Sequence, residues 1–516
     1  MGRYNVMASR THNSIVNIIA AFCCQFLGQA SGFVVRTVFI HVLQTEYLGI
    51  NGLFTNILQM LSLAELGVNA ALIYSMYKPM AEKDEHAISM YMGLYKRIYS
   101  VIGFVVLVAG FALIPFLDFF VSERPKIAES LELIYALYVI RTASTYFFAY
   151  KQSVFQADQK NYIISRNTLY FTLIRSVVEI AVLVLFRSFL IYLAIAVAFN
   201  YLQNIWIARL ADKAYPFIRG KTPKSDPKVV KQLVKNVKAM FMHKVSAVVL
   251  NSSDNIILSK FVGLIAVGLY SNYSMIIVLV RNCLYMIFDG IVPSVGNLCA
   301  LKDKNEVYSV FKLISYGNMW LTGFCSLAMM LLFQPFITVW AGPDYLMGKE
   351  VVLAIVVSFY IQTNMRAIDM FRSATGLFYN DRYVPIAQCI INVVVSILFI
   401  KRIGVAGIFV GTAVAMLLTV FWVQPMLVFK KIFQLPVRIY FTQYFAYTAI
   451  WVAAGILTSS VTRLIQLDGI LNLIWTGACV TVIPNAVFLL ATCRTTEFKS
   501  AMMKVRGMVK KKDTKG

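Results

Sequence analysis

Apolar stretches long enough to cross a bilayer follow one another along the chain of 516 residues, from Ile15 to Cys493. A transmembrane helix needs about 20 mostly apolar residues. Only short polar segments separate the stretches, so the pattern predicts an all-α integral membrane protein with about 14 transmembrane helices. The predicted spans are 14–41, 50–73, 93–115, 128–150, 163–186, 189–209, 239–260, 264–292, 310–334, 350–371, 384–400, 404–428, 440–461 and 469–491.

The composition agrees with a membrane protein. Hydrophobic residues make up 59% of the chain and charged residues 14%, and the mean hydropathy is +0.70. Soluble proteins carry about 25% charged residues. The first apolar stretch exceeds the roughly 7 to 15 residues of a signal-peptide core, so we expect it to stay in the protein as a span.

The net charge of +24 raises the question of a nucleic-acid partner, and the positions of the basic residues answer it. With the N-terminus in the cytoplasm, the cytoplasmic loops hold about four times as many Lys and Arg residues as the other loops, as the positive-inside rule expects. This bias predicts a multi-pass protein with both termini in the cytoplasm. Anionic membrane lipids, rather than nucleic acid, are the expected partners of these charges.

A basic, proline-containing segment near the middle of the chain is typical of a linker between two halves. A shift of about 220 residues pairs Tyr162 with Tyr383 and Pro216 with Pro436, which favours an internal duplication. Six helices per repeat is an even number, so both copies enter the membrane from the same side. The predicted parts are an N-terminal six-helix lobe (1–210), a basic cytoplasmic linker (211–238), a C-terminal six-helix lobe (239–430), two additional transmembrane helices (431–493) and a basic cytoplasmic tail (494–516).

Several predicted spans contain basic residues, which are costly at bilayer depth and usually face a bundle interior or a wet cavity. Each arginine costs about 2.5 to 3.5 kcal/mol on insertion scales. A planar guanidinium binds phosphate through two parallel hydrogen bonds, so an arginine-lined cavity suits an anionic substrate. The candidate substrate-binding residues are Arg36, Arg141, Arg175, Arg281, Lys244 and Arg366.

Acidic residues also occur in the spans, some on the same helical face as an arginine. Arg175 lies four positions before Glu179, and Arg281 lies eight before Asp289. These residues are either structural ion pairs that hold helices together or parts of a polar cavity wall, and the sequence leaves both readings open. The candidate charge partners or ion-coupling residues are Glu65, Glu179, Asp254 and Asp289.

Two further patterns concern helix packing and enzyme chemistry. Gly28 and Gly32 have the small-xxx-small spacing that favours close helix packing. The four histidines are scattered near predicted helix ends, and no hydrolase, phosphate-loop or metal-site motif is found. We therefore predict no catalytic residues, no metal and no cofactor.

Several segments distributed over nearly the whole chain carry a resemblance to a known family. They are Arg36-Thr-Val-Phe-Ile, Glu46-Tyr-Leu-Gly-Ile-Asn-Gly-Leu-Phe, Asp254-Asn-Ile-Ile-Leu-Ser, Gly268-Leu-Tyr-Ser-Asn-Tyr, Phe371-Arg-Ser-Ala-Thr-Gly-Leu-Phe, Asp381-Arg-Tyr and Gly404-Val-Ala-Gly-Ile-Phe-Val-Gly-Thr. These segments resemble the bacterial polysaccharide transporter family. The chain is similar to Wzx-type flippases, in the superfamily shared with multidrug and toxin extrusion (MATE) transporters and the lipid II flippase MurJ.

The resemblance implies a MATE-like fold of two pseudo-symmetric six-helix lobes plus two C-terminal helices, in the bacterial cytoplasmic membrane. It implies a flippase that moves undecaprenyl-diphosphate-linked oligosaccharide to the outer leaflet for polysaccharide synthesis, by alternating access through a basic central cavity. Arg36, Arg141, Arg175 and Arg281 are the positions expected to meet the diphosphate and sugar. The expected partners are this lipid-linked substrate and the polymerase and glycosyltransferases of the pathway.

Two other functions stay open at this point. A cation-coupled drug exporter would use acidic residues such as Glu65, Glu179 or Asp254 to carry an ion. A membrane enzyme of glycan assembly is disfavoured because the sequence predicts no large extracytoplasmic loop. The sequence does not specify the glycan, the ion coupling or the oligomeric state.

Overall fold

The computed structural model describes residues 24–62, 68–121, 123–220, 227, 248–250, 252–377, 380–465, 467–500 and 502–503. Within these ranges the chain forms helices joined by short loops and contains no strand. The chain divides into two compact units, Met1–Gly268 and Leu269–Gly516. The sequence had predicted a boundary in the linker 211–238; most of that segment lies outside the described residues, and the predicted division stays a prediction.

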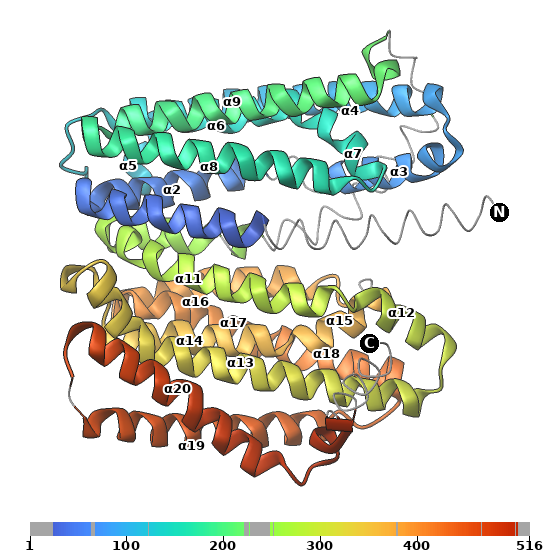
Figure 1. Cartoon of the computed structure of the whole chain (residues 1–516), viewed down its shortest axis with the longest axis vertical. Helices are drawn as coiled ribbons and strands as arrows, with labels where there is room; N and C mark the ends of the chain where they lie inside the picture. The colour runs from blue at the N-terminus through green and yellow to red at the C-terminus, as the bar shows by residue number, and fades with distance from the viewer. Residues whose placement is uncertain are drawn as a thin grey trace, which may run out of the picture. The chain divides into compact units, whose positions relative to one another are not determined.

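The long helices of unit 1 lie side by side and roughly parallel to one another (Figure 1). In this unit α6 packs between α4 and α9, and α8 packs on α9. Two unlabelled helices cover 24–42 and 252–261. The labelled helices are α2 (Thr45–Leu61), α3 (Val68–Glu82), α4 (Glu85–Ala112), α5 (Leu117–Phe120), α6 (Leu131–Ala149), α7 (Ser153–Ala157), α8 (Asn161–Phe186) and α9 (Phe189–Ala214).

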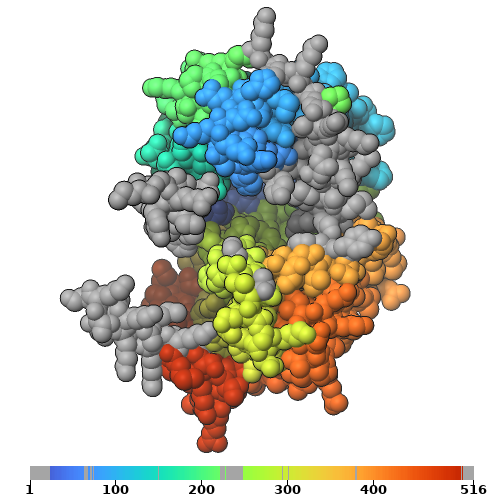
Figure 2. All heavy atoms as spheres, turned by 90° about the vertical axis from the view of Figure 1, so that its right-hand side faces the viewer, coloured from blue at the N-terminus to red at the C-terminus, as the bar shows by residue number. Residues whose placement is uncertain are grey.

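Unit 2 takes in most of α11, whose first turn belongs to unit 1. In this unit α17 packs on α14 and α16, and the last two helices, α19 and α20, pack together and on α13 (Figure 1). Figure 2 views the ends of the helices near the start of α13, drawn in yellow-green. The helices are α11 (Leu264–Asp289), α12 (Val292–Leu301), α13 (Lys304–Trp340), α14 (Lys349–Asn364), α15 (Arg366–Ala374), α16 (Val384–Ile403), α17 (Ala406–Leu418), α18 (Val420–Val428), α19 (Arg438–Leu464) and α20 (Gly469–Thr492).

Local sequence signals set several helix ends. Asp84 caps α4 by accepting a hydrogen bond from the backbone N–H of Ala87 at 2.9 Å. Asp303 caps α13 through the N–H of Glu306, and Ser130 caps α6. Such caps satisfy backbone donors that have no partner within the helix. At the other end of α16, Gly404 has a φ of +61°, a conformation that favours glycine.

Helix α8 shows which environment surrounds the protein. Val177 is 68% exposed, and Ile174 and Leu185 are also exposed on the outer face of this helix. Ser176 and Glu179 are buried on the other face. An apolar outside and a polar inside are expected when the surrounding solvent is lipid.

Ten helices among the described residues are long and apolar enough to cross a membrane, so the predicted all-α membrane fold is confirmed, whereas the number fourteen is not. Of the other four predicted spans, 14–41, 50–73 and 239–260 extend into residues outside the described ranges. The fourth corresponds to α6, whose Glu132 and Arg141 lower its hydropathy. Because of these charged residues, α6 is not among the ten helices counted above.

The predicted span 350–371 has an internal break. Residues 350–371 were predicted as a continuous helix, but α14 ends at Asn364 and α15 begins at Arg366. At the break, the Asn318 side chain of α13 donates hydrogen bonds to the carbonyls of Thr363 and Asn364, at 3.2 and 3.0 Å. A carbonyl freed by a helix break needs such a partner inside a membrane protein.

Glycines allow the close approach of α17 and α16. A Cβ atom added to Gly407 would lie 2.4 Å from the carbonyl carbon of Phe399, and one added to Gly411 would lie 2.7 Å from the backbone nitrogen of Ser396. These glycines have the small-xxx-small spacing. The sequence had placed such packing at Gly28 and Gly32, but a Cβ there would meet no described atom within 4 Å. That prediction is wrong for the part of the chain described here.

We expect Gly411→Ala to destabilise the protein, because the added methyl group would clash with the α16 backbone. Overpacking typically costs about 1–3 kcal/mol. Thermal unfolding of the purified protein in detergent would show a lower Tm. Gly477→Ala on α20 is the control, since nothing lies within 4 Å of its added Cβ. Equal Tm values for the two variants would contradict the packing argument.

Candidate functional site

Four helices of unit 1 bring charged and aromatic groups together. Arg36 lies on helix 24–42, Arg141 on α6, and Arg175 and Glu179 on α8. All four lie within electrostatic range of Tyr192 on α9. Three of these four charged side chains are cationic. The structure thus brings together three of the arginines that the sequence proposed, and we call Arg36, Arg141 and Arg175 the arginine cluster.

Hydrogen bonds between helices surround the arginine cluster. The Tyr138 hydroxyl on α6 donates to Asn51 on α2 at 2.6 Å. The Asn200 side chain on α9 donates to the carbonyl of Arg141 at 3.3 Å. Because these bonds join different helices, they fix the part of α6 that carries Arg141 relative to its neighbours. The backbone that presents this guanidinium is therefore held in place.

Glu179 forms an ion pair with Arg175. Its carboxylate lies 3.3 Å from Nε of Arg175, and its side chain is 4% exposed, whereas that of Arg175 is 29% exposed. The Arg175 Nε–H does not have the geometry of a hydrogen bond. Guanidinium groups gathered on several membrane helices are suited to an anionic ligand.

In unit 2, Arg281 has a neutral partner. Its guanidinium on α11 donates to the side-chain oxygen of Gln362 on α14 at 3.3 Å. A neutral amide orients the guanidinium but leaves its charge uncompensated. Arg281 therefore shares the chemistry of the arginine cluster, although it belongs to the other unit.

Arg366 stands in a different environment. Its guanidinium pairs with Asp289 and with Asp369, the latter at 2.6 Å, and lies 4.8 Å from the ring centroid of Tyr285. Two carboxylates thus neutralise one guanidinium. The sequence proposed Arg366 as a substrate-binding residue, but its surroundings are those of a structural ion pair.

The pairs of Arg366 continue into a buried network. Arg372 lies 2.6 Å from both Asp369 and Asp381, and Gln424 on α18 contacts Asp381 at 3.5 Å. The side chain of Asp381 is 0% exposed and that of Arg372 is 10% exposed. The network connects α15 with the start of α16 and with α18. We call Asp289, Arg366, Asp369, Arg372 and Asp381 the ion network.

The sequence left open whether these arginines and carboxylates form structural ion pairs or line a cavity. The two expected pairs have different outcomes in the structure. The Arg175–Glu179 pair is formed. The alternative pairing of Arg281 with Asp289 is replaced by Arg281–Gln362 and Arg366–Asp289. Asp254 lies in helix 252–261, and Lys244 and Glu65 lie outside the described residues.

Sequence reasoning missed four residues of these sites: Gln362, Asp369, Arg372 and Asp381. A signal was available for two of them, because Arg366, Asp369 and Arg372 follow one another at intervals of three and therefore share a helix face. No spacing rule connects Asp381 with Arg372, since a loop separates them. Arg372 and Asp381 entered the sequence analysis only as parts of segments that carried the family resemblance.

Solved structures with the same fold include a lipid flippase and multidrug transporters. The lipid II flippase MurJ in an inward closed conformation has a TM-score of 0.68 and 13% identity, with 93% of this chain and 100% of that chain covered. An inward-facing multidrug resistance MATE transporter of the MOP superfamily has a TM-score of 0.63 and 10% identity, with coverages of 79% and 97%. The Vibrio cholerae MATE transporter VcmN in its bent form gives 0.53 and 13%, with coverages of 82% and 98%.

These similarities establish the fold: this is a multi-pass, all-helical membrane protein with the fold of MATE transporters and MurJ. Residues 14–298, more than half of the chain, match the family described as polysaccharide biosynthesis protein. The chain belongs to this family, which confirms the family resemblance seen in the sequence. No curated protein matches the chain.

We expect Asp381→Asn to destabilise unit 2, because it leaves the buried Arg372 guanidinium with less compensation. Breaking a buried ion pair costs about 3–5 kcal/mol, and the lower end is expected here because Arg372 keeps Asp369. The measurement is the Tm of the purified variant in detergent.

The matched control is Asp118→Asn on the short helix α5. Arg124 binds Asp118 at 2.9 Å and lowers the pKa of that carboxyl, but both side chains are exposed. Exposed pairs contribute little to stability. If both Asn variants shifted the Tm equally, the ion network would not be the structural element described above.

Proposed function

We propose that this protein is a flippase that moves a polyprenyl-diphosphate-linked oligosaccharide from the cytoplasmic to the outer leaflet of the bacterial cytoplasmic membrane. The substrate is a repeat unit for capsule, exopolysaccharide or O-antigen synthesis, and alternating access is the proposed mechanism. The polymerase and glycosyltransferases of the pathway are the proposed partners, and both termini are proposed to lie in the cytoplasm. The protein itself acts as a transporter rather than an enzyme.

The arginine cluster is the observation that carries this proposal. Guanidinium groups on transmembrane helices are costly, so they usually face a bundle interior or a wet cavity and serve a function there. A diphosphate carries negative charges and acceptor oxygens that match guanidinium geometry. Tyr192 lies within electrostatic range of all three arginines, and Tyr138 lies within range of Arg36 and Arg141. An anionic headgroup with attached sugar fits both features.

The family and the fold support the same substrate class. The matching family is described by polysaccharide biosynthesis, and one protein of the same fold is named as a lipid II flippase. A substrate made of a lipid carrier, a glycan and an anionic linker between them would match both descriptions. Its linker would bring negative charge to the arginine cluster. Arg281 of unit 2 is the second proposed contact, whereas the neutralised Arg366 is not retained as one.

Two of the four acidic candidates, Glu179 and Asp289, fit a cation-coupled drug exporter less well. Glu179 is paired with Arg175, and Asp289 is paired with Arg366. A carboxylate that compensates an arginine is less available to bind a transported cation. We therefore retain the flippase as the proposed function.

We expect Arg175→Gln and Arg281→Gln each to reduce flipping of a labelled undecaprenyl-diphosphate glycan in proteoliposomes. Losing one hydrogen-bonded contact to a charged group costs about 1.5–3 kcal/mol, so flipping should fall by about tenfold or more. The control is Arg124→Gln, which removes an arginine from an exposed ion pair. Full activity in both test variants would return these two arginines to a structural role, and inactive wild-type protein would defeat the proposal itself.

We further expect flipping to respond to an imposed membrane potential. An inside-negative potential assists outward movement of negative charge by about 2.3 kcal/mol per charge per 100 mV. The initial flipping rate should therefore rise when a potassium gradient with valinomycin makes the substrate-donor side negative, and fall when the gradient is reversed. If neither polarity changed the flipping rate, the rate-limiting step of flipping would not move the negative charge of the headgroup across the membrane. That result would contradict this prediction.

A further inference from the structure

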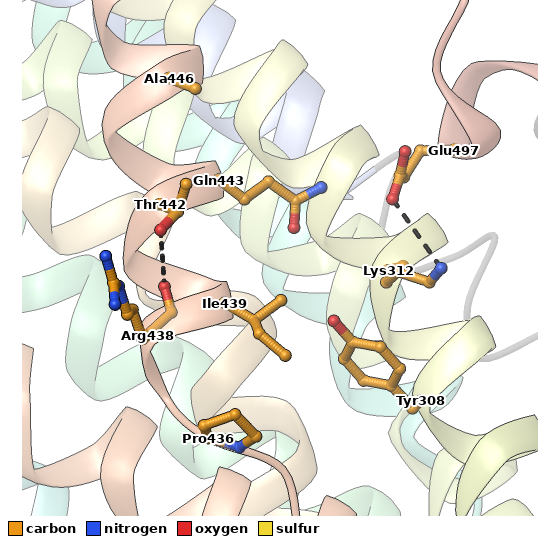
Figure 3. A pocket seen from close by; sticks show the side chains of 9 residues that line it. All are labelled: Tyr308, Lys312, Pro436, Arg438, Ile439, Thr442, Gln443, Ala446 and Glu497. Carbon is orange, nitrogen blue, oxygen red and sulfur yellow. Dashed lines mark hydrogen bonds and ion pairs between the residues drawn. The ribbon is translucent and has the colours of Figure 1, made fainter.

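A pocket of about 770 Å³ lies in unit 2, apart from the arginines discussed above. Helix α13 supplies Tyr308 and Lys312, the start of α19 supplies most of the remaining wall, and Glu497 comes from the segment after α20 (Figure 3). The full lining is Tyr308, Lys312, Pro436, Arg438, Ile439, Thr442, Gln443, Ala446 and Glu497.

The position of the pocket along the helices places it at a membrane surface. Helices α13 and α19 both begin at the pocket, and α20 ends shortly before Glu497. All three helices are long and apolar enough to span the bilayer. A pocket at the shared end of three spans lies at the level where lipid headgroups meet acyl chains.

Two opposite charges face the pocket without a hydrogen bond between them. Nζ of Lys312 and Oε1 of Glu497 are 4.0 Å apart, beyond the 2.7–3.2 Å of a direct hydrogen bond. The Lys312 side chain is 32% exposed and that of Glu497 is 12% exposed. A loosely paired, largely buried lysine and carboxylate gain from a ligand that brings an anion to one and a hydrogen-bond donor to the other.

The remaining walls fit an amphiphile. In Figure 3 the side chains of Tyr308 and Gln443 point into the space in front of Lys312, whereas the Arg438 guanidinium points to the other side of α19. The apolar side chains of Ile439 and Ala446 on α19 line the same pocket. The pocket therefore combines a polar end that contains both charges with apolar side chains from α19.

We propose that this pocket binds the zwitterionic headgroup of a membrane phospholipid with a primary ammonium, of the phosphatidylethanolamine class. The phosphate accepts from Lys312 and from the Tyr308 hydroxyl, and the ammonium donates to Glu497. A primary ammonium has three N–H donors, whereas a quaternary choline has none. A headgroup with negative charge alone would stand beside Glu497 without compensation. The site thus distinguishes bulk lipids by their headgroups and acts independently of the transported substrate.

The test uses the full-length protein in nanodiscs with equal amounts of phosphatidylethanolamine, phosphatidylcholine and phosphatidylglycerol of identical chains. Lipids retained after detergent extraction are counted by native mass spectrometry. We expect the wild type to retain phosphatidylethanolamine about tenfold over the other two, the ratio typical of one charged hydrogen bond. Glu497→Gln should remove this preference, and Lys312→Gln should lower retention of all three lipids.

Matched controls come from the same helix. Lys302 and Glu306 form an exposed ion pair at the start of α13, outside the pocket, so Lys302→Gln and Glu306→Gln should retain lipid as the wild type does. Ala446→Trp would fill the pocket at an exposed position without changing its charge, and it should abolish the selective retention even if Glu497→Gln fails to fold.

The proposal would be overturned by no preference in the wild type, by an unchanged preference in Glu497→Gln or Ala446→Trp, or by a preference for phosphatidylglycerol. Displacement of phosphatidylethanolamine by low concentrations of a polyprenyl diphosphate would also overturn it, because the pocket would then be a substrate site. The assay measures retained lipid and not transport, so its failure leaves the proposed flippase function untouched.

Discussion

The compensation of charge within the bilayer is the constraint on which the rest of this structure depends. A guanidinium among transmembrane helices must find a carboxylate, a polar neighbour, water or a ligand. In unit 2 Arg366 and Arg372 have carboxylates, as in the Arg372–Asp381 pair at 2.6 Å. In unit 1 the three arginines of the cluster and Glu179 all lie within electrostatic range of Tyr192, and Glu179 pairs with Arg175. Arg366 and Arg372 of unit 2 therefore take part in ion pairs, whereas the arginines of the cluster in unit 1 are the proposed ligand contacts.

This difference connects packing with function. The ion network joins α15 to the start of α16 and to α18, close to the break between α14 and α15 at Met365. Buried, mutually paired charges of this kind act between helices as structural contacts. The arginine cluster, in contrast, stands among tyrosines and amides whose hydrogen bonds hold the backbone of α6 in place. In the function proposed above, a ligand with negative charge binds at this cluster.

Much of the fold could be predicted from the sequence, because lipid imposes a strong pattern on it. Apolar length predicted ten of the spans, and the polar stripe of α8 faces inward as expected. The break at Met365 was not predictable in this way, since it depends on Asn318 of another helix. Close packing at Gly407 and Gly411, rather than at Gly28 and Gly32, was likewise decided by the neighbouring helix, which the spacing does not identify.

The candidate site was predictable in part for the same reason. Arginines in apolar spans are visible in a sequence, so Arg141, Arg175 and Arg281 were found. Their partners were not, because Gln362 and Asp381 are brought to Arg281 and Arg372 by tertiary structure. The exclusion of Arg366 from the proposed site required knowledge of both of its carboxylates. Sequence locates the charge, and structure shows whether it is compensated.

The central claim is that the arginine cluster contacts the anionic headgroup of a lipid-linked glycan, and photo-crosslinking tests it most directly. An undecaprenyl-diphosphate sugar with a diazirine next to the diphosphate would be bound to the protein, irradiated and mapped by peptide mass spectrometry. The account predicts adducts on α6 and α8 near Arg141 and Arg175, which an excess of unlabelled substrate suppresses. Competable adducts confined to other helices, with none near these arginines, would contradict it.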